Sequence, residues 1–215
     1  TIRAVDDISF TIPEGKYTII LGASGAGKST VLNILGGMDS PTSGLVRVND
    51  KEISKFNKRQ LTEYRRESIG FVFQFYNLMP NLTVLENVEL ASQICKNPLD
   101  AKEVLGMVGL GDRLNNFPAQ CSGGEQQRGA IARALAKNPD VLLCDEPTGA
   151  LDYQTGKAIL ALLYELCKQS KKTVVVVTHN GALAPTADIL IRMKNGKIES
   201  FTENPHPVPV QELEW

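Results

Sequence analysis

The fold of this chain is decided by Gly22-Ala23-Ser24-Gly25-Ala26-Gly27-Lys28-Ser29-Thr30, a stretch that matches the phosphate-binding P-loop pattern G-x-x-x-x-G-K-[ST]. A β-branched, apolar run at 17–21 precedes it, and a segment with helical spacing at 31–35 follows it, which is the context that the motif requires. Glycines let backbone N–H groups converge on phosphate oxygens, and a helix N-terminus favours an anion. We therefore expect this stretch to bind a nucleotide, with Lys28 on its β- and γ-phosphates and Ser29 on Mg²⁺.

Composition and charge limit the class of protein. The chain has 215 residues, of which 42% are hydrophobic, enough to bury the core of one domain. Its formal net charge of −1 gives no overall attraction to nucleic acid, and we expect no nucleic-acid partner. No apolar run approaches the ~20 residues that span a bilayer. The four cysteines form no C-x-x-C pair and the first residues form no charged-then-apolar leader, so we expect a reducing, cytoplasmic setting.

Strand patterns lie on both sides of the P-loop. Residues 5–12 alternate roughly between apolar and polar, and the turn at 13–16 leads into the run at 17–21, which predicts an N-terminal hairpin. Three further elements are predicted in this half of the chain: a strand at 45–48, a short exposed helix at 55–67, and a buried strand at 69–73 that ends directly on Gln74.

The pattern then changes to helix between 83 and 137 before strands return. The elements predicted after it are a strand at 141–144, a helix with a buried face at 159–166, a central strand at 173–177, and a hairpin over 189–201 that turns at Asn195-Gly196. This order indicates an α/β core at about 1–75 and 138–201, interrupted by a helical insertion at about 76–137. The tail at 202–215 carries alternate prolines and ends in Trp215, which predicts a mobile end or an extended arm.

Two carboxylates follow the apolar strand at 141–144 directly. The carboxyl ends of strands are where α/β proteins bind ligands, so Asp145 and Glu146 are predicted to lie at that edge. Asp145 would hold Mg²⁺ directly or through water, and Glu146 would orient or deprotonate the water that attacks the γ-phosphate. In isolation, an Asp-Glu pair before a Pro turn would be read as a solvated loop. The P-loop in the same chain favours the catalytic interpretation.

A second anion-binding device precedes the helix that starts near residue 125. Cys121-Ser122-Gly123-Gly124-Glu125-Gln126-Gln127-Arg128 offers backbone N–H groups and a serine hydroxyl at a helix N-terminus. One nucleotide needs only one such cradle, so the second is predicted to serve the nucleotide of a neighbouring subunit in a symmetric dimer.

Six motifs in this order resemble the ATP-binding subunits of ABC transporters. The matching residues are Gly22 to Thr30 (Walker A), Gln74 (Q-loop), Ser122 to Gln127 (signature), Leu143 to Glu146 (Walker B), Ala150 to Asp152 (D-loop) and His179 (H-loop). The segments at 33–39, 69–74 and 147–152 look most like the lipoprotein-release and macrolide-export subgroup. The resemblance implies a single ABC ATPase domain over 1–215. Its fold would be α/β, a P-loop NTPase core with an antiparallel β subdomain and an inserted α-helical subdomain.

The resemblance also implies roles for individual residues. The residues implied to bind ATP are Gly22, Ala23, Ser24, Gly25, Ala26, Gly27, Lys28, Ser29, Thr30 and Gln74, with Ser122, Gly123, Gly124 and Glu125 reaching the nucleotide across a homodimer. The residues implied at Mg²⁺ are Ser29, Gln74 and Asp145. Glu146 and His179 are implied to be catalytic, the first as general base and the second as a hydrogen-bonding partner of the γ-phosphate and the attacking water.

This chain departs from the family pattern at two places. Cys121 stands where the signature usually opens with leucine, and the smaller side chain is expected to loosen the packing under the signature helix. The family also usually carries an aromatic residue that stacks on adenine ahead of the first strand, and no aromatic residue precedes Phe10 here. What stacks on adenine is therefore left open by the sequence.

The predicted function is an ATP-hydrolysing subunit that dimerises around two Mg-ATP and powers a membrane ABC transporter of the export or lipoprotein/lipid extraction type. Its partner would be an integral-membrane permease subunit that docks against 74–81 and the helical insertion, at the inner face of the cell membrane. An alternative is a regulatory or mechanotransmitting ATPase of a membrane complex that moves no solute. A DNA-repair or chromosome ATPase would need a long heptad insertion between Gln74 and Ser122, and the 47 residues at 75–121 carry no sustained heptads.

Overall fold

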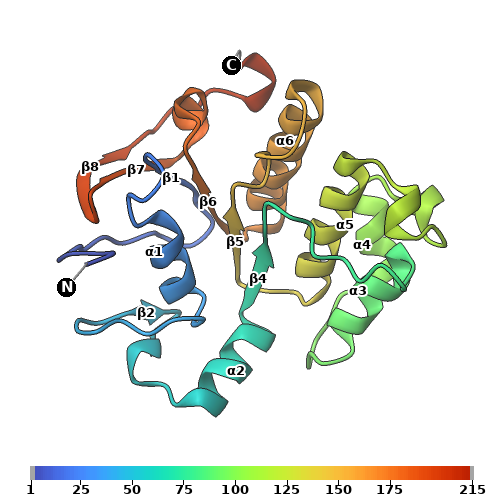
Figure 1. Ribbon diagram of the computed structural model, residues 1–215, viewed down its shortest axis with the longest axis horizontal. Helices are drawn as coiled ribbons and strands as arrows, with labels where there is room; N and C mark the ends of the chain where they lie inside the picture. The colour runs from blue at the N-terminus through green and yellow to red at the C-terminus, as the bar shows by residue number, and fades with distance from the viewer. Residues whose placement is uncertain (1–2, 214–215) are drawn as a thin grey trace.

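A six-stranded sheet forms the centre of the molecule (Figure 1), and the structure, a computed structural model, describes residues 3–213. In sheet order, its strands are β4 (Ile69–Val72), β5 (Val141–Asp145), β6 (Thr173–Thr178), β1 (Tyr17–Leu21), β7 (Ile189–Lys194) and β8 (Lys197–Glu203). The first five run parallel, and β8 returns antiparallel to β7. A separate two-stranded antiparallel ladder joins β2 (Arg47–Val48) and β3 (Lys51–Glu52).

Strand β1 carries the P-loop at its end and lies in the interior of the sheet. All five of its residues are buried, as expected of a parallel strand covered on both faces. Leu21 pairs with Thr178 of β6, and Asp145 of β5 pairs with Val177 of β6. The loops that follow β1, β5 and β6 therefore leave the sheet at the same edge, where the predicted site residues gather.

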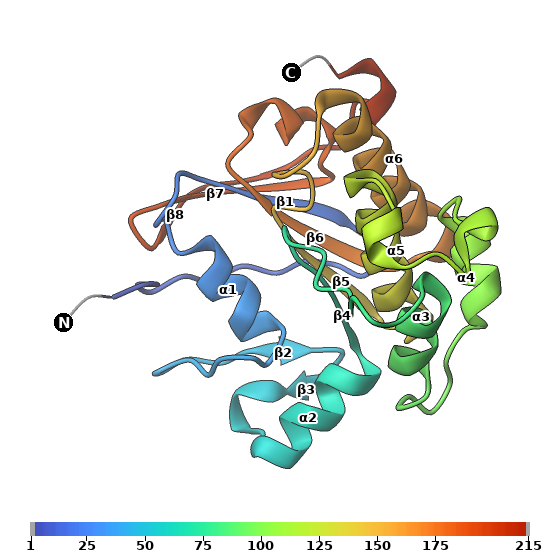
Figure 2. The same ribbon diagram turned by 45° about the vertical axis from the view of Figure 1, so that its right-hand side comes forward.

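Helices cover both faces of the sheet (Figure 2). The α-helices are α1 (Lys28–Leu35), α2 (Lys58–Glu67), α3 (Val84–Ser92), α4 (Ala101–Met107), α5 (Gly123–Ala136) and α6 (Tyr153–Ser170). The 3₁₀ helices are η1 (Ile53–Lys55), η2 (Gly111–Arg113), η3 (Pro118–Gln120), η4 (Gly181–Thr186) and η5 (Val210–Glu212). None of the helices within 3–213 combines the length and apolar character needed to cross a bilayer.

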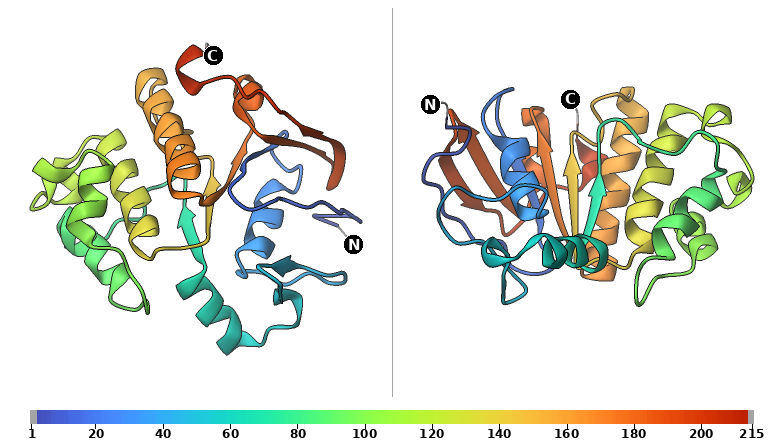
Figure 3. Two further views of the ribbon diagram at one scale, coloured as in Figure 1. Left: turned by 180° about the vertical axis from the view of Figure 1, so that it is seen from behind. Right: turned by 60° about the horizontal axis from the view of Figure 1, so that its bottom comes forward.

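The side chains of β1 alternate between two hydrophobic cores. Tyr17, Ile19 and Leu21 join the core formed with α3, α4, α5 and α6, whereas Ile20 joins the core formed with α1 and α2. Figure 3 shows the two helical layers on either side of the strands. The helical character predicted between 83 and 137 is confirmed by α3, α4 and α5, while the boundaries of an insertion at 76–137 stay a prediction.

The strand predicted at 5–12, which would have formed an N-terminal hairpin with 17–21, is wrong. The structure assigns no strand between residues 3 and 16, although Val5, Ile8 and Phe10 pack partly buried against the core that contains α1. Asp7 takes a left-handed conformation with φ 52°, which interrupts an extended ladder. The alternation of apolar and polar residues at 5–12 therefore reflects the burial of one side of an extended segment that pairs with no strand.

The other differences from the sequence prediction lie at element ends. The strand predicted at 45–48 shortens to Arg47–Val48. The helix predicted at 55–67 begins at Lys58, because the side chain of Asn57 accepts a hydrogen bond from Gln60 N and caps it. The predicted tail is an arm that packs on the domain, with Val210 and Leu213 buried, whereas Trp215 lies outside the described residues.

Asp188 ties the amino end of β1 to α6 and offers a test of the fold. Its carboxylate accepts hydrogen bonds from the backbone N–H of Tyr17 at 2.7 Å and from Lys168 Nζ at 2.6 Å, and it is 6% exposed. Replacing Asp188 with Ala leaves both donors without this acceptor, so we expect a loss of about 3 kcal/mol in the free energy of unfolding. Urea unfolding monitored by circular dichroism measures it.

The control for this substitution is Glu199→Ala. Glu199 forms an exposed ion pair with Lys194 at 3.8 Å, and its removal is expected to cost less than about 1 kcal/mol. Equal losses in the two variants would contradict the role assigned to Asp188.

Candidate functional site

The P-loop connects β1 to α1 and presents an open helix N-terminus. Gly25 and Gly27 take left-handed conformations with φ 77° and 96°, which glycine adopts without strain. No side chain caps α1, so the backbone N–H groups of its first turn remain available to an anion. A Cβ on Gly27 would also lie 2.4 Å from the carbonyl oxygen of Ala4, so glycine is required there for packing.

Lys28 lies folded over the loop. It is 7% exposed, and its Nζ donates a hydrogen bond to the carbonyl oxygen of Ala23 at 3.0 Å. The ammonium group is therefore held inside the P-loop, where the phosphate oxygens of a bound nucleotide would also lie. This arrangement fixes a positive charge at the loop, as the predicted contact with β- and γ-phosphates would require.

Ser29 and Asp145 meet although 116 positions separate them in the sequence. Ser29 Oγ donates a hydrogen bond to Asp145 Oδ1 at 3.2 Å. Burial raises the pKa of the Asp145 carboxyl, an effect that a bound cation would oppose. A hydroxyl and one carboxylate fit Mg²⁺ in nucleotide sites, since this ion takes few protein oxygens and completes its shell with phosphates and waters.

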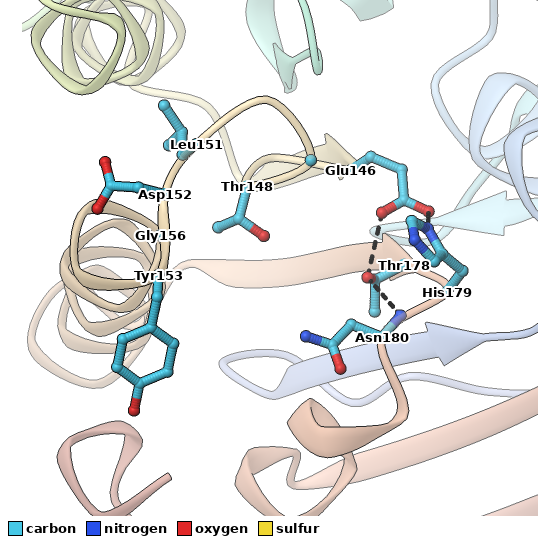
Figure 4. Close-up of a pocket in the computed structure, with 10 residues that line it drawn as sticks. Glu146, Thr148, Leu151, Asp152, Tyr153, Gly156, Thr178, His179 and Asn180 are labelled. Carbon is cyan, nitrogen blue, oxygen red and sulfur yellow. Dashed lines mark hydrogen bonds and ion pairs between the residues drawn. The ribbon is translucent and has the colours of Figure 1, made fainter. Parts of the chain in front are cut away.

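Glu146 and His179 form the second cluster at this edge (Figure 4). Glu146 Oε1 lies 2.8 Å from His179 Nδ1, and Glu146 Oε2 accepts a hydrogen bond from Thr178 Oγ1 at 3.1 Å. The backbone N–H of Glu146 donates to Val177 O at 2.9 Å, and Glu146 has a left-handed φ of 47°. The carboxylate is thus fixed from both sides, as a general base must be.

A cavity of about 260 Å³ opens beside this cluster. Its walls include Glu146, His179 and Asn180 on one side and Asp152 and Tyr153 on the other. The cavity therefore joins the predicted general base to the segment that precedes α6.

The contacts of two polar residues at this edge were not predicted from the sequence. Thr178 is 2% exposed and ends an apolar strand, so its composition indicated only a buried strand residue. The fully buried Gln127 donates from Nε2 to Pro147 O at 2.7 Å and to Phe73 O at 3.3 Å. The sequence analysis assigns Gln127 to the signature segment, but no sequence signal indicates this link, because its acceptors lie 54 and 20 positions away along the chain.

Gln74 packs against Gly149, a residue that lines the cavity beside Glu146. A Cβ on Gly149 would lie 2.9 Å from Gln74 Nε2, so the two residues are packed together. Within 3–213, no hydrogen bond joins Gln74 to Ser29 or Asp145. The role of Gln74 at Mg²⁺ therefore stays a prediction.

The signature segment, residues 122–127, lies on the other face of the sheet from the P-loop helix. Helix α5 contributes Ile131 and Leu135 to one core, whereas α1 contributes Val31 and Leu32 to the other. Figure 1 shows the two helices on either side of the central strands. The two segments predicted to bind anions are thus held apart within one chain.

The signature segment is also ordered by a capping box. The Ser122 side chain accepts from Glu125 N, and Glu125 Oε2 accepts from Ser122 N at 2.8 Å. Glu125 Oε1 lies 2.8 Å from Arg113 Nε. The Arg113 guanidinium and the Ser122 N–H lower the pKa of Glu125 to about 2, so this carboxylate stays ionised at neutral pH. The effect of Cys121, which is buried beneath the segment, stays a prediction.

Comparison with known proteins shows which proteins this chain resembles. The profile of the family described as ABC transporter matches residues 5–149. An uncharacterized ABC transporter ATP-binding protein of Thermotoga maritima is 50% identical over 205 residues, covering 93% of this chain and 87% of that protein. The lipoprotein-releasing system ATP-binding protein LolD of Cytophaga hutchinsonii is 43% identical over 203 residues, covering 92% and 93%.

Two further similarities differ in scope. The macrolide export ATP-binding/permease protein MacB of Rhodopseudomonas palustris is 44% identical, but this chain spans only 31% of its length. Among solved structures, the dimeric post-hydrolysis state of the ATP-binding cassette MJ0796 bound to ADP and Pi superposes with a TM-score of 0.85 at 43% identity, covering 94% of this chain and 91% of that one. MJ0796 belongs to Methanocaldococcus jannaschii.

Proposed function

This chain belongs to the ABC transporter family, and we propose that it hydrolyses ATP as one half of a homodimer that closes around two Mg-ATP and powers an export or lipoprotein/lipid extraction transporter. The observation that carries this proposal is the fixed Glu146 carboxylate, held by His179 and Thr178 at the sheet edge from which the P-loop also departs. A phosphate cradle and an oriented base at one edge are the parts that phosphoryl transfer to water requires.

Within one subunit, the chain's own residues bind and orient the reactants. The backbone of Gly22–Thr30 and Lys28 Nζ hold the β- and γ-phosphates. Ser29, Asp145 and Gln74 would hold Mg²⁺, which neutralises charge developing on the phosphate oxygens. Glu146 accepts a proton from the water as its oxygen attacks the γ-phosphorus, and the bond to the β-phosphate oxygen breaks to give ADP and phosphate. His179 keeps the Glu146 carboxylate aimed and offers a hydrogen bond to the γ-phosphate.

The second half of each site comes from the partner subunit in this proposal. Ser122, Gly123, Gly124 and Glu125 would bind the nucleotide of the other protomer, which agrees with the separation of α5 from α1 across the sheet. A C2 dimer gives two such shared sites from one interface. The dimeric state of the similar cassette bound to ADP and Pi supports this arrangement.

An exposed apolar surface supports docking to a membrane-spanning partner. Phe75 is 71% exposed and Met79 is 51% exposed in the loop after β4, and Leu90 and Ile94 are 43% and 58% exposed in and after α3. Met79 N donates a hydrogen bond to Asn87 Oδ1 of α3, so the loop and the helix are neighbours, and exposed large apolar side chains on neighbouring elements indicate a protein interface. We propose that this surface receives the cytoplasmic side of an integral-membrane permease subunit, which places the chain at the inner face of the cell membrane.

The test is purification of the tagged full-length chain from membranes of its source in mild detergent, followed by reconstitution. We expect a polytopic membrane protein to co-purify and the complex to hydrolyse Mg-ATP in liposomes. The double variant Phe75→Asp/Met79→Asp is expected to lose this partner, because two desolvated carboxylates would oppose apolar docking. Phe201→Asp in β8, where Phe201 is 40% exposed, is the matched control and should retain it.

The liposome experiment also distinguishes a transporter ATPase from a mechanotransmitting ATPase. Solute movement coupled to hydrolysis in the liposomes supports a transporter, and stimulated hydrolysis without movement of any offered lipoprotein, lipid or amphiphile favours the mechanotransmitting alternative. Hydrolysis that no membrane protein changes would contradict both.

A further inference from the structure

The C-terminal strap, residues 204–213, runs back over the domain from the end of β8. Its first half is anchored on η4, because Asn204 Nδ2 and Val208 N donate hydrogen bonds to Pro185 O at 3.1 and 2.9 Å. Helix η4 (Gly181–Thr186) begins two residues after His179. The strap is therefore bound to the segment that carries one wall of the catalytic cavity.

The second half of the strap is anchored on the first turns of α6. Val210 is 1% exposed and Leu213 is 6% exposed, both within the core that includes α6. Leu213 O accepts hydrogen bonds from Tyr153 Oη at 3.0 Å and from Lys157 Nζ at 2.7 Å. Two donors on one carbonyl oxygen fix the position of this turn.

Tyr153 brings the strap to the other wall of the cavity. It follows Asp152 directly, it begins α6, and it lines the cavity together with Asp152 and Gly156. Figure 4 shows its ring pointing away from Glu146, with the hydroxyl toward the strap. One segment thus holds the two walls of the cavity beside Glu146, through η4 on one side and α6 on the other.

We propose that the strap is a positioning element for ATP hydrolysis. By tying the start of α6 to η4, it sets the distance between the Asp152 wall and the His179 wall, and so keeps Glu146 and the attacking water aligned. This inference rests on the proposed function, since it concerns the rate of the hydrolysis that Glu146 carries out. The strap contacts neither the P-loop nor the signature segment by any hydrogen bond within 3–213, so its effect belongs on the chemical step and not on ATP affinity.

The first test compares Val210→Asp with Gln211→Asp in the full-length chain. Val210 is buried and Gln211 next to it is exposed, so the same charge releases the strap in one variant and leaves it bound in the other. With Val210→Asp we expect faster Glu-C cleavage after Glu212, the one glutamate within 204–213, and a kcat lowered about fivefold at unchanged KM for ATP. Gln211→Asp should match the wild type in both measurements.

A second pair of variants leaves the apolar packing intact. Lys157→Met removes one donor to Leu213 O and is expected to lower kcat about twofold, whereas Lys157→Arg keeps a donor and should restore it. This pair decides the matter if Val210→Asp does not fold. A strap released in the proteolysis assay with kcat unchanged, or a Lys157→Met variant with wild-type kcat, would overturn the inference. A wild-type chain without any Mg-ATP hydrolysis would instead overturn the proposed function and this inference with it.

Discussion

Glu146→Gln is expected to lower kcat for ATP hydrolysis by about 10²- to 10³-fold while ATP still binds. An amide has the shape of the carboxylate but cannot accept the proton of the attacking water. The amide can still receive the hydrogen bond from Thr178 and meet His179, so the cavity is expected to keep its form. Because ATP persists, the variant should accumulate as an ATP-bound dimer.

Two measurements check this expectation. Steady-state phosphate release gives kcat, and size-exclusion chromatography with and without Mg-ATP gives the dimer. Glu165→Gln, an exposed carboxylate of α6, controls for the loss of one negative charge and should behave as the wild type. A Glu146→Gln chain that remains monomeric in Mg-ATP and hydrolyses at the normal rate would show that another group is the base.

A substitution of Thr178 tests separately whether the orientation of the Glu146 carboxylate matters. Thr178→Val keeps the volume of a buried side chain but removes the hydrogen bond to Glu146 Oε2. If orientation of the carboxylate contributes to catalysis, kcat should fall less than with Glu146→Gln and KM for ATP should stay the same.

The central part of the site could be predicted because it depends on strand ends. Once 17–21, 141–144 and 173–177 are placed as parallel strands, Gly22, Asp145 and His179 must emerge at one edge of the sheet. Spacing in the sequence is enough for this, since parallel strands share a direction. The contact between Ser29 and Asp145 follows from it.

The features that could not be predicted from the sequence are those that depend on tertiary contacts. The apolar residues at 5–12 pack against the core that contains α1. No local sequence signal distinguishes such packing from a strand paired in a sheet. Likewise, the alternate prolines after residue 203 prevent pairing with a β-strand, but they do not prevent the tail from packing on the domain. Their neighbour Val208 still donates to Pro185 O, and the spacing of Val210 and Leu213 was the one sign of a buried turn.

The division of each catalytic site between two subunits is tested by mixing two inactive variants. Lys28→Ala removes the cation from the β- and γ-phosphates of its own nucleotide. Ser122→Arg destroys the capping box of α5 and places a bulky cation where the partner subunit's γ-phosphate would lie. Each homodimer carries the same lesion at both sites, so each is expected to be nearly inactive.

In a mixed dimer the lesions fall together on one site. The intact P-loop of the Ser122→Arg chain then faces the intact signature segment of the Lys28→Ala chain, and the other site carries both lesions. With random association at equal concentrations, half of the dimers are mixed and each has one of two sites intact, so we expect recovery of about a quarter of the wild-type ATPase activity. The separation of α1 and α5 across the sheet is the structural reason to expect this.

The assay is informative only where dimers close, so it is run at high protein concentration or in the reconstituted membrane complex. Cross-linking with differently tagged chains measures the fraction of mixed dimers. Absence of recovery in a mixture that contains them would mean either that the signature segment serves its own chain's nucleotide or that both sites must be intact. A tandem chain separates these outcomes, because confining both lesions to one of its two halves leaves an intact P-loop and signature segment in the other. Activity there but not in the mixture would assign the signature segment to its own chain's nucleotide and overturn the shared-site arrangement. Inactivity in both would show that hydrolysis needs two complete sites.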